Sequence, residues 1–158
     1  MTMRWRMTVA GAAFLLVGVT AASADSPDTP APAQAPAAAA AGSLEAAETK
    51  VNAGDFRGAI PMLSAIVKRE PRNADALNLM GYSLRKTGKF KLALQYYNAA
   101  LAIAPQNLGA NEYLGELYVQ MRQPAKARHQ LAILTAACGA DCVQTRDLSA
   151  AIAKGPSQ

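Results

Sequence analysis

Histidine and cysteine are scarce in this 158-residue chain, which has one histidine, His129, and two cysteines, Cys138 and Cys142. A protein metal site needs three or four ligands, so no metal is expected. Haem attachment needs a histidine directly after a C-x-x-C, which is absent. Nucleophilic catalysis would have to use His129 or a buried carboxylate beside an activated serine or cysteine. We therefore expect no enzyme and no cofactor.

Charge is also sparse, at 17% of the residues. Sixteen Lys and Arg against 11 Asp and Glu give a net charge of +5, without a basic cluster as dense as a nucleic-acid patch. We therefore expect no nucleic-acid partner. The basic balance indicates little beyond solubility and some attraction to acidic surfaces.

The N-terminal segment Met1–Ala24 has the three parts of a secretory signal. Arg4 and Arg6 give the positive start, residues 7–20 are apolar, and residues 22–24 form an A-x-A cleavage site. Cleavage predicts a periplasmic or secreted protein of 134 residues with a charge of about +3. The alternative is an uncleaved anchor that tethers the chain to the membrane, although the apolar segment is barely long enough to span it. A cysteine does not follow that segment, which excludes a lipoprotein anchor.

Residues 25–42 are rich in proline and alanine and contain no large apolar residue. Such a segment cannot bury enough surface to offset its chain entropy, so we expect a disordered linker. For the rest of the chain we predict one folded domain at residues 43–154 and a short tail at residues 155–158.

A period of 34 residues runs through the predicted domain. Such a period indicates stacked copies of one small unit. In the best-formed unit, Asn73 can cap a first helix, Gly88 can end it in a left-handed conformation, and Pro105 ends a second helix. The recurring positions are Gly54, Phe56, Ala59 and Pro71, then Gly88, Phe90, Ala93 and Pro105, with Gly81 and Ala93 returning as Gly115 and Ala127.

The pattern Leu77-x2-Met80-Gly81-x2-Leu84, followed by Gly88-x-Phe90-x2-Ala93-x3-Tyr97-x2-Ala100-x4-Pro105, resembles the tetratricopeptide repeat. It departs from that family in having Leu77 for the usual tryptophan and Leu84 for the usual tyrosine. The resemblance implies an all-α fold in which helical hairpins stack as a short right-handed α-solenoid. The repeats would span about 40–73, 74–107 and 108–141.

The outer units carry signals of their own. Ser43, Asp55 and Asn107 can cap helices. In the third unit Asn111 replaces the large apolar residue, and Gly139 replaces the closing proline. A capping helix is predicted at residues 142–154, started by a capping box at Asp141 and Gln144. Its apolar face, made of Leu148, Ala151 and Ile152, would cover the last hairpin. The first helix of the first unit matches the repeat pattern poorly, so weak self-association through that end of the stack remains an alternative.

Cys138 and Cys142 stand across the turn before that capping helix. In an exported protein an even pair indicates a disulfide, which would pin the helix to the stack. Two alternatives remain: a thiol–disulfide redox centre, although its C-x3-C spacing differs from C-x-x-C, and free thiols.

The resemblance further implies that the first helix of each hairpin lines a concave groove that binds a protein or peptide of unknown identity. An amide could bond a peptide backbone, tyrosine could pack against it and charges could select its sequence. The alternative is a solvated helix face with no ligand. Glu112 and Glu116 are expected to lie on an open groove that does not desolvate them, as an acid catalyst would require. The clamp that some family members use to bind C-terminal carboxylates is absent. The function expected is a non-catalytic adaptor or assembly factor. The groove positions are Glu45, Glu48 and Asn52; Asn78, Tyr82, Arg85 and Lys86; and Glu112, Tyr113, Glu116 and Gln120.

Overall fold

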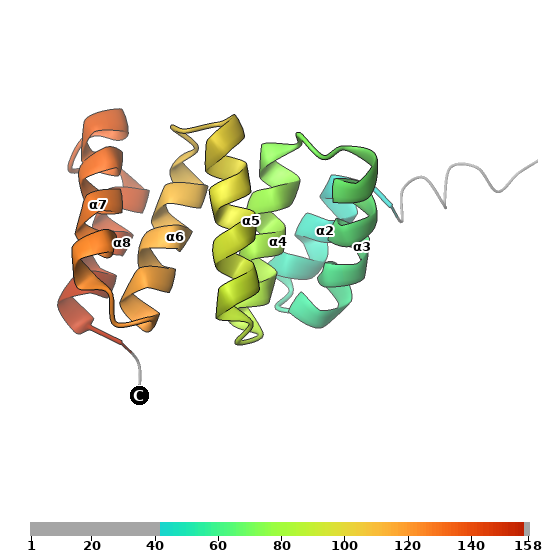
Figure 1. The fold of residues 1–158 in the computed structure, drawn as a ribbon, viewed down its shortest axis with the longest axis horizontal. Coiled ribbons are helices and arrows are strands. Elements are labelled where there is room, and N and C mark those ends of the chain that lie inside the picture. Colours follow the sequence, from blue (N-terminus) through green and yellow to red (C-terminus); the bar gives the residue numbers. More distant parts are fainter. Residues whose placement is uncertain (1–41, 157–158) are drawn as a thin grey trace, which may run out of the picture. The chain divides into compact units, whose positions relative to one another are not determined.

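The computed structural model describes residues 42–156, which fold into seven α-helices and no strand (Figure 1). The predicted signal peptide Met1–Ala24, all of the predicted linker except Gly42, and Ser157 and Gln158 lie outside the described residues. The helices are α2 (Leu44–Asn52), α3 (Phe56–Arg69), α4 (Ala74–Lys86), α5 (Phe90–Ile103), α6 (Leu108–Gln120), α7 (Pro124–Cys138) and α8 (Val143–Lys154).

Four helices begin at side chains that were predicted to cap them. Ser43 accepts a hydrogen bond from the N–H of Ala46 before α2, and Asp55 accepts one from Gly58 before α3. Asn73 and Asn107 do the same for α4 and α6, at 3.0 and 2.9 Å. Each cap satisfies an N–H that has no partner inside the helix, so it fixes where the helix starts.

The first helix of each hairpin ends in a left-handed residue. Gly54 and Gly88 have φ of +77° and +78°, as expected from the sequence. The equivalent position 34 residues later is Arg122, which adopts φ +57° although it is not glycine. The chain therefore keeps the same turn geometry in the third unit, with a side chain that favours it less.

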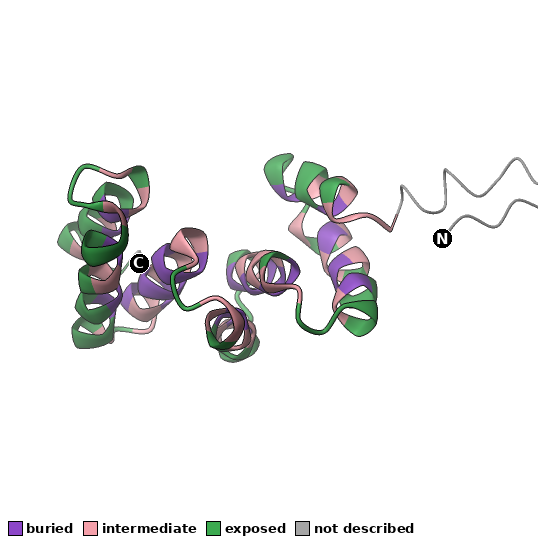
Figure 2. Cartoon of the chain, turned by 90° about the horizontal axis from the view of Figure 1, so that it is seen from above, coloured by how far each residue is buried: buried purple, intermediate pink, exposed green. Residues whose placement is uncertain are grey.

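The helices alternate between two layers. In Figure 1, α3, α5 and α7 lie in front, and α2, α4, α6 and α8 lie behind them. Each helix packs on the next one in the chain, and the rear helices also contact one another in the order α2, α4, α6, α8. The buried residues in Figure 2 lie on the faces where helices meet. This arrangement confirms the predicted stack of helical hairpins.

The core repeats with the sequence. Ala59, Ala93 and Ala127 are fully buried, and small residues at these positions let the paired helices approach closely. Met80, Leu114 and Leu148 are also 34 residues apart, and they are 3, 2 and 0% exposed. Since Leu148 belongs to α8, this helix takes the place of the first helix of a fourth hairpin.

The two repeated glycines Gly81 and Gly115 are both buried but meet different neighbours. A Cβ at Gly81 would lie 2.8 Å from the ring of Tyr97, whereas one at Gly115 would collide with the end of Leu148. The difference arises because the position of Tyr97 holds the smaller Leu131 in the third unit. Leu148 of α8 fills the space that the smaller side chain leaves beside Gly115.

The predicted capping box at Asp141 is wrong. Helix α8 begins one residue later, with Cys142 as its N-cap, and no side chain accepts a capping hydrogen bond there. The sulfur of Cys142 is bonded to Cys138, so it is held away from the helix N–H groups. Between residues 42 and 156, no helix is long and apolar enough to cross a membrane. The same residues hold no group of three or more His, Cys, Asp or Glu side chains placed to hold a metal ion.

Candidate functional site

The rear layer contains a hollow of about 300 Å³ between α2, the start of α3, α4 and α6. The groove positions Asn52, Tyr82, Lys86 and Tyr113 reach it, as predicted for the first helices. Each is held on a rigid helix or at its end, so the hollow is shaped before any partner arrives. Its complete lining is Val51, Asn52, Gly54, Phe56, Leu79, Tyr82, Lys86 and Tyr113.

Three aromatic rings from three successive hairpins form a row along this hollow. Phe56 and Tyr82 meet edge to face with ring centroids 5.7 Å apart, and Tyr82 and Tyr113 lie 4.6 Å apart. Burial raises the pKa of Tyr113 above its ordinary value. Its hydroxyl is a neutral group that can donate a hydrogen bond. The contribution of Phe56 was missed because its recurrence as Phe90 marked it as a packing residue. Its place directly after the turn at Gly54, beside the end of α2, was the available signal.

Two cations lie over these rings, and within residues 42–156 only one of them has no carboxylate partner. The Arg85 guanidinium lies 5.3 Å from the Tyr82 ring and 5.8 Å from the Tyr113 ring, and it also forms a salt bridge with Glu116. Arg85 is only 6% exposed, so its charge interacts with groups inside the stack and is not presented to a partner. Lys86 is exposed, and its ammonium lies 5.6 Å from the ring centroids of both Phe56 and Tyr82.

Comparison with known proteins agrees with this architecture. Residues 44–107 match one family model of the tetratricopeptide repeat, and residues 84–141 match a second. The chain belongs to the tetratricopeptide-repeat family. It is also 32% identical over 96 residues to the human protein General transcription factor 3C polypeptide 3, in an alignment that covers 56% of this chain and 10% of the human protein. The chain thus spans about a tenth of that relative's length. Tetratricopeptide repeats are protein–protein interaction modules, and the family points to a non-catalytic scaffold.

The remaining predicted groove residues of this tetratricopeptide-repeat protein lie outside the hollow. Arg85, Glu116 and Gln120 line a second, smaller hollow of about 130 Å³ beside α8. Asn78 is half-buried where α4 meets α6, and a Cβ on Gly109 would lie 3.2 Å from its amide nitrogen. Glu45 and Glu48 are exposed on α2. The predicted groove is therefore divided into two parts with different chemistry.

The expectation of a solvated Glu112 is wrong. Its side chain is only 8% exposed because α8 packs on α6. Burial, together with the nearby charges of Glu116 and Asp147, raises the pKa of Glu112 to about 7, although Arg85 partly compensates. The contact depends on where α8 docks, and the repeat pattern of the first three units carries no signal for that.

The predicted disulfide between Cys138 and Cys142 is present, with the two Cα atoms 5.8 Å apart. It joins the last residue of α7 to the N-cap of α8. The buried Thr145 hydroxyl lies 3.5 and 3.3 Å from the two sulfurs. Sulfurs in a disulfide carry no hydrogen, so the hydroxyl is the donor. The bond thus lies inside a packed corner of the repeat domain, and a redox role for it stays a prediction.

Proposed function

We propose that the chain is an adaptor or assembly factor that binds a peptide segment or a helix of another protein in the hollow between α2, α4 and α6. The observation that carries this proposal is the row formed by Phe56, Tyr82 and Tyr113. Aromatic residues that are half-buried beside an open hollow supply much of the binding energy at protein interfaces. Because three hairpins each contribute one ring, a bound segment would contact the whole N-terminal part of the stack.

The rigidity of the hollow supports binding of a flexible partner. Its side chains stand on capped helices or at the start of one, and the rings already contact one another. Little entropy is then lost on the side of this protein when a partner binds. Peptide recognition in a helix-lined groove uses a few apolar anchors together with polar contacts, and the lining of this hollow supplies both.

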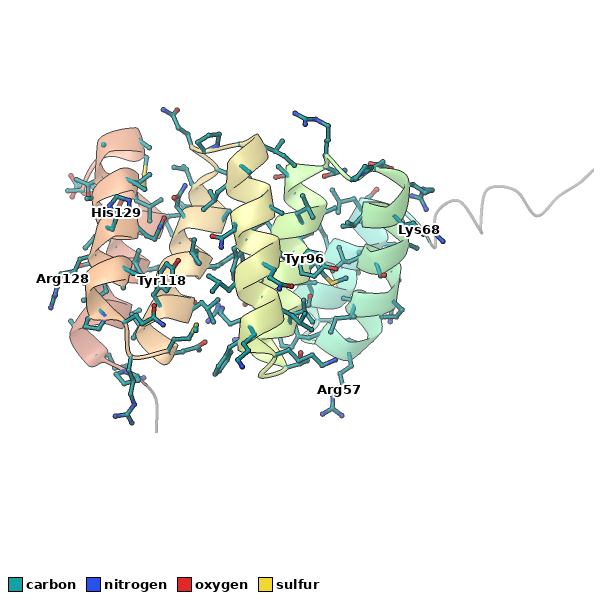
Figure 3. All side chains as sticks on the ribbon, in the orientation of Figure 1. Arg57, Lys68, Tyr96, Tyr118, Arg128 and His129 are labelled. Atoms are coloured by element: carbon teal, nitrogen blue, oxygen red, sulfur yellow. A yellow bond between two sulfur atoms is a disulfide. The ribbon has the colours of Figure 1, made fainter. Side chains whose placement is uncertain are left out.

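The test is affinity capture with mass spectrometry, comparing the wild type with Tyr82→Ala. The matched control is Tyr96→Ala, because Tyr96 lies on α5 in the opposite layer (Figure 3). We expect partners that the control retains to be lost from the Tyr82 variant. Identical partner sets for all three proteins, or no partner at all, would contradict a role for the hollow.

We also propose that the protein acts outside the cytoplasm, in the periplasm or as a secreted protein, after removal of Met1–Ala24. The support is the order of positive, apolar and small residues in that segment, together with an internal disulfide, which persists in oxidising compartments. N-terminal sequencing of the protein purified from its native cell checks both points. An intact Met1 would favour a scaffold tethered to the membrane instead.

A further inference from the structure

Lys86 is the only charged residue among the eight that line the hollow. Its ammonium lies over the rings of Phe56 and Tyr82 and is exposed to solvent. Across residues 42–156 the salt bridges and side-chain hydrogen bonds involve other cations, so Lys86 has no acceptor of its own. All three of its N–H donors are therefore available to a bound molecule.

Two carboxylates on the elements around the hollow already have partners of their own. Glu116 is paired with Arg85. Asp55 accepts a hydrogen bond from Lys50 at 2.8 Å and another from the N–H of Gly58, and these bonds lower its pKa. A carboxylate that approaches Lys86 from outside consequently meets a cation without a competing internal partner.

A third hollow, of about 380 Å³, adjoins the candidate hollow at Lys86. Gly54, Phe56 and Lys86 line both of these hollows. Arg57 also lines the third one, and its side chain points away from the helices (Figure 3). Gly54 leaves the junction open, since a Cβ there would meet no atom within 4 Å. A bound chain can therefore continue past Lys86 in both directions instead of ending there.

We propose that the hollow selects a partner segment with an internal aspartate or glutamate that pairs with Lys86. An aliphatic or aromatic neighbour of that acid enters the hollow against Leu79, Tyr82 and Tyr113. The proposal rests on the proposed function and specifies its partner. It uses the charge complementarity of an unpaired cation in a hollow whose own lining holds no carboxylate, since Asp55 of the adjoining hollow is paired with Lys50. Because the two hollows are continuous at Lys86, the acid lies inside the partner segment and not at its end.

The test uses the full chain and a phage-displayed library of random twelve-residue peptides, flanked on both sides so that chain ends are hidden. The most enriched peptide is then made with acetylated and amidated ends, and its affinity is measured by fluorescence anisotropy. We expect enriched peptides to share an acidic residue within four positions of a large apolar one. Binding should weaken at least tenfold for Lys86→Met and further for Lys86→Glu.

Charge exchange and a matched lysine sharpen the result. A peptide with lysine in place of its acidic residue should bind Lys86→Glu better than the wild type. Lys126 is the control, because its ammonium also lies over a tyrosine ring, 5.3 Å from that of Tyr118, but on α7 outside the hollow. Lys126→Met should change the affinity less than twofold.

The outcomes separate this inference from the proposed function. Binding that Tyr82→Ala abolishes but the Lys86 variants leave unchanged would overturn the inference and keep the function. Capture of phosphatidylglycerol vesicles that Lys86→Glu abolishes would also overturn it. A library without enriched peptides, or peptides indifferent to Tyr82→Ala, would contradict both.

Discussion

At the scale of single residues, the turn after each first helix shows what the repeat requires. Gly54, Gly88 and Arg122 occupy the same place and all have positive φ. A left-handed conformation costs an L-residue with a side chain roughly 1–2 kcal/mol, a cost that glycine avoids. The third unit therefore carries a local strain that the first two do not have.

We expect Arg122→Gly to stabilise the protein, by up to about 1 kcal/mol. Glycine removes the strain of the left-handed conformation, and this gain exceeds the loss caused by the greater conformational entropy of glycine in the unfolded chain. Gly88→Ala should destabilise by about 1 kcal/mol for the opposite reason, since the space around Gly88 is open and only its φ matters. Urea denaturation followed by circular dichroism measures both. Equal effects of the two substitutions would contradict this account.

At the scale of elements, α8 is fastened to the last hairpin by two independent features. Leu148 fills the space above Gly115, and the disulfide joins the start of α8 to the end of α7. The first depends on packing and the second on a covalent bond that closes a very short loop. They can be separated because dithiothreitol acts on only one of them.

Reduction should lower the free energy of unfolding by about 2 kcal/mol, the chain-entropy value for so short a loop. The measurement is urea denaturation with and without dithiothreitol. The double variant Cys138→Ser/Cys142→Ser should match the reduced protein and should not respond to dithiothreitol. If reduction under native conditions removed more helical signal than α8 alone contributes, the disulfide would also stabilise helices other than α8.

Glu112 makes the contact between α6 and α8 depend on pH. Its pKa is raised from 4.5 to about 7 in the folded protein, so between these values the folded state binds a proton that the unfolded state has released. Stability should therefore fall as pH rises from about 4.5 to 7, by on the order of 3 kcal/mol, and level off above pH 7.

Glu112→Gln should flatten this profile and stabilise the protein at pH 8, because a neutral amide replaces a buried charge beside Glu116 and Asp147. Glu48→Gln is the control, since Glu48 is exposed on α2 and its substitution should leave the profile unchanged. Denaturation midpoints measured from pH 4.5 to 8.5 check both variants. A wild-type profile that is flat in this range would contradict the assignment.

The elements differ in how far they could be predicted from the sequence. The caps at Ser43, Asp55, Asn73 and Asn107 are local, since each side chain reaches an N–H only three residues away. The burial of Glu112 depends instead on how α8 docks, through contacts distant in the sequence. The start of α8 follows from the disulfide of its N-cap, Cys142, which the competing cap signal at Asp141 obscured. The row of rings lies between these cases: Tyr82 and Tyr113 follow from the family's groove, whereas Phe56 joins them only because α3 starts beside the end of α2.

At the scale of the whole described domain, the stack is nearly one-dimensional. Each helix contacts its neighbours along the stack, and α8 contacts α6 and α7. Stability in such an array is close to a sum of unit and interface contributions, so damage at one end spreads inward from that end. Most of the candidate hollow, which is lined by α2, the start of α3, α4 and α6, lies toward the other end.

Removal of α8 should therefore damage the C-terminal hairpin, including the side of the hollow that Tyr113 forms, while the side formed by α2, α3 and α4 keeps its structure. A chain that ends at Gly139 exposes the buried faces of Leu114 and Gly115, so we expect it to associate at micromolar concentration in size-exclusion chromatography. Hydrogen exchange should show lost protection in α6 and α7 and unchanged protection in α2 and α3. A chain that ends at Gly155 is the control and should behave as the wild type. Loss of protection spread evenly over all the helices would mean that the domain unfolds as one cooperative unit, because an end effect confined to the last hairpin requires independent repeats.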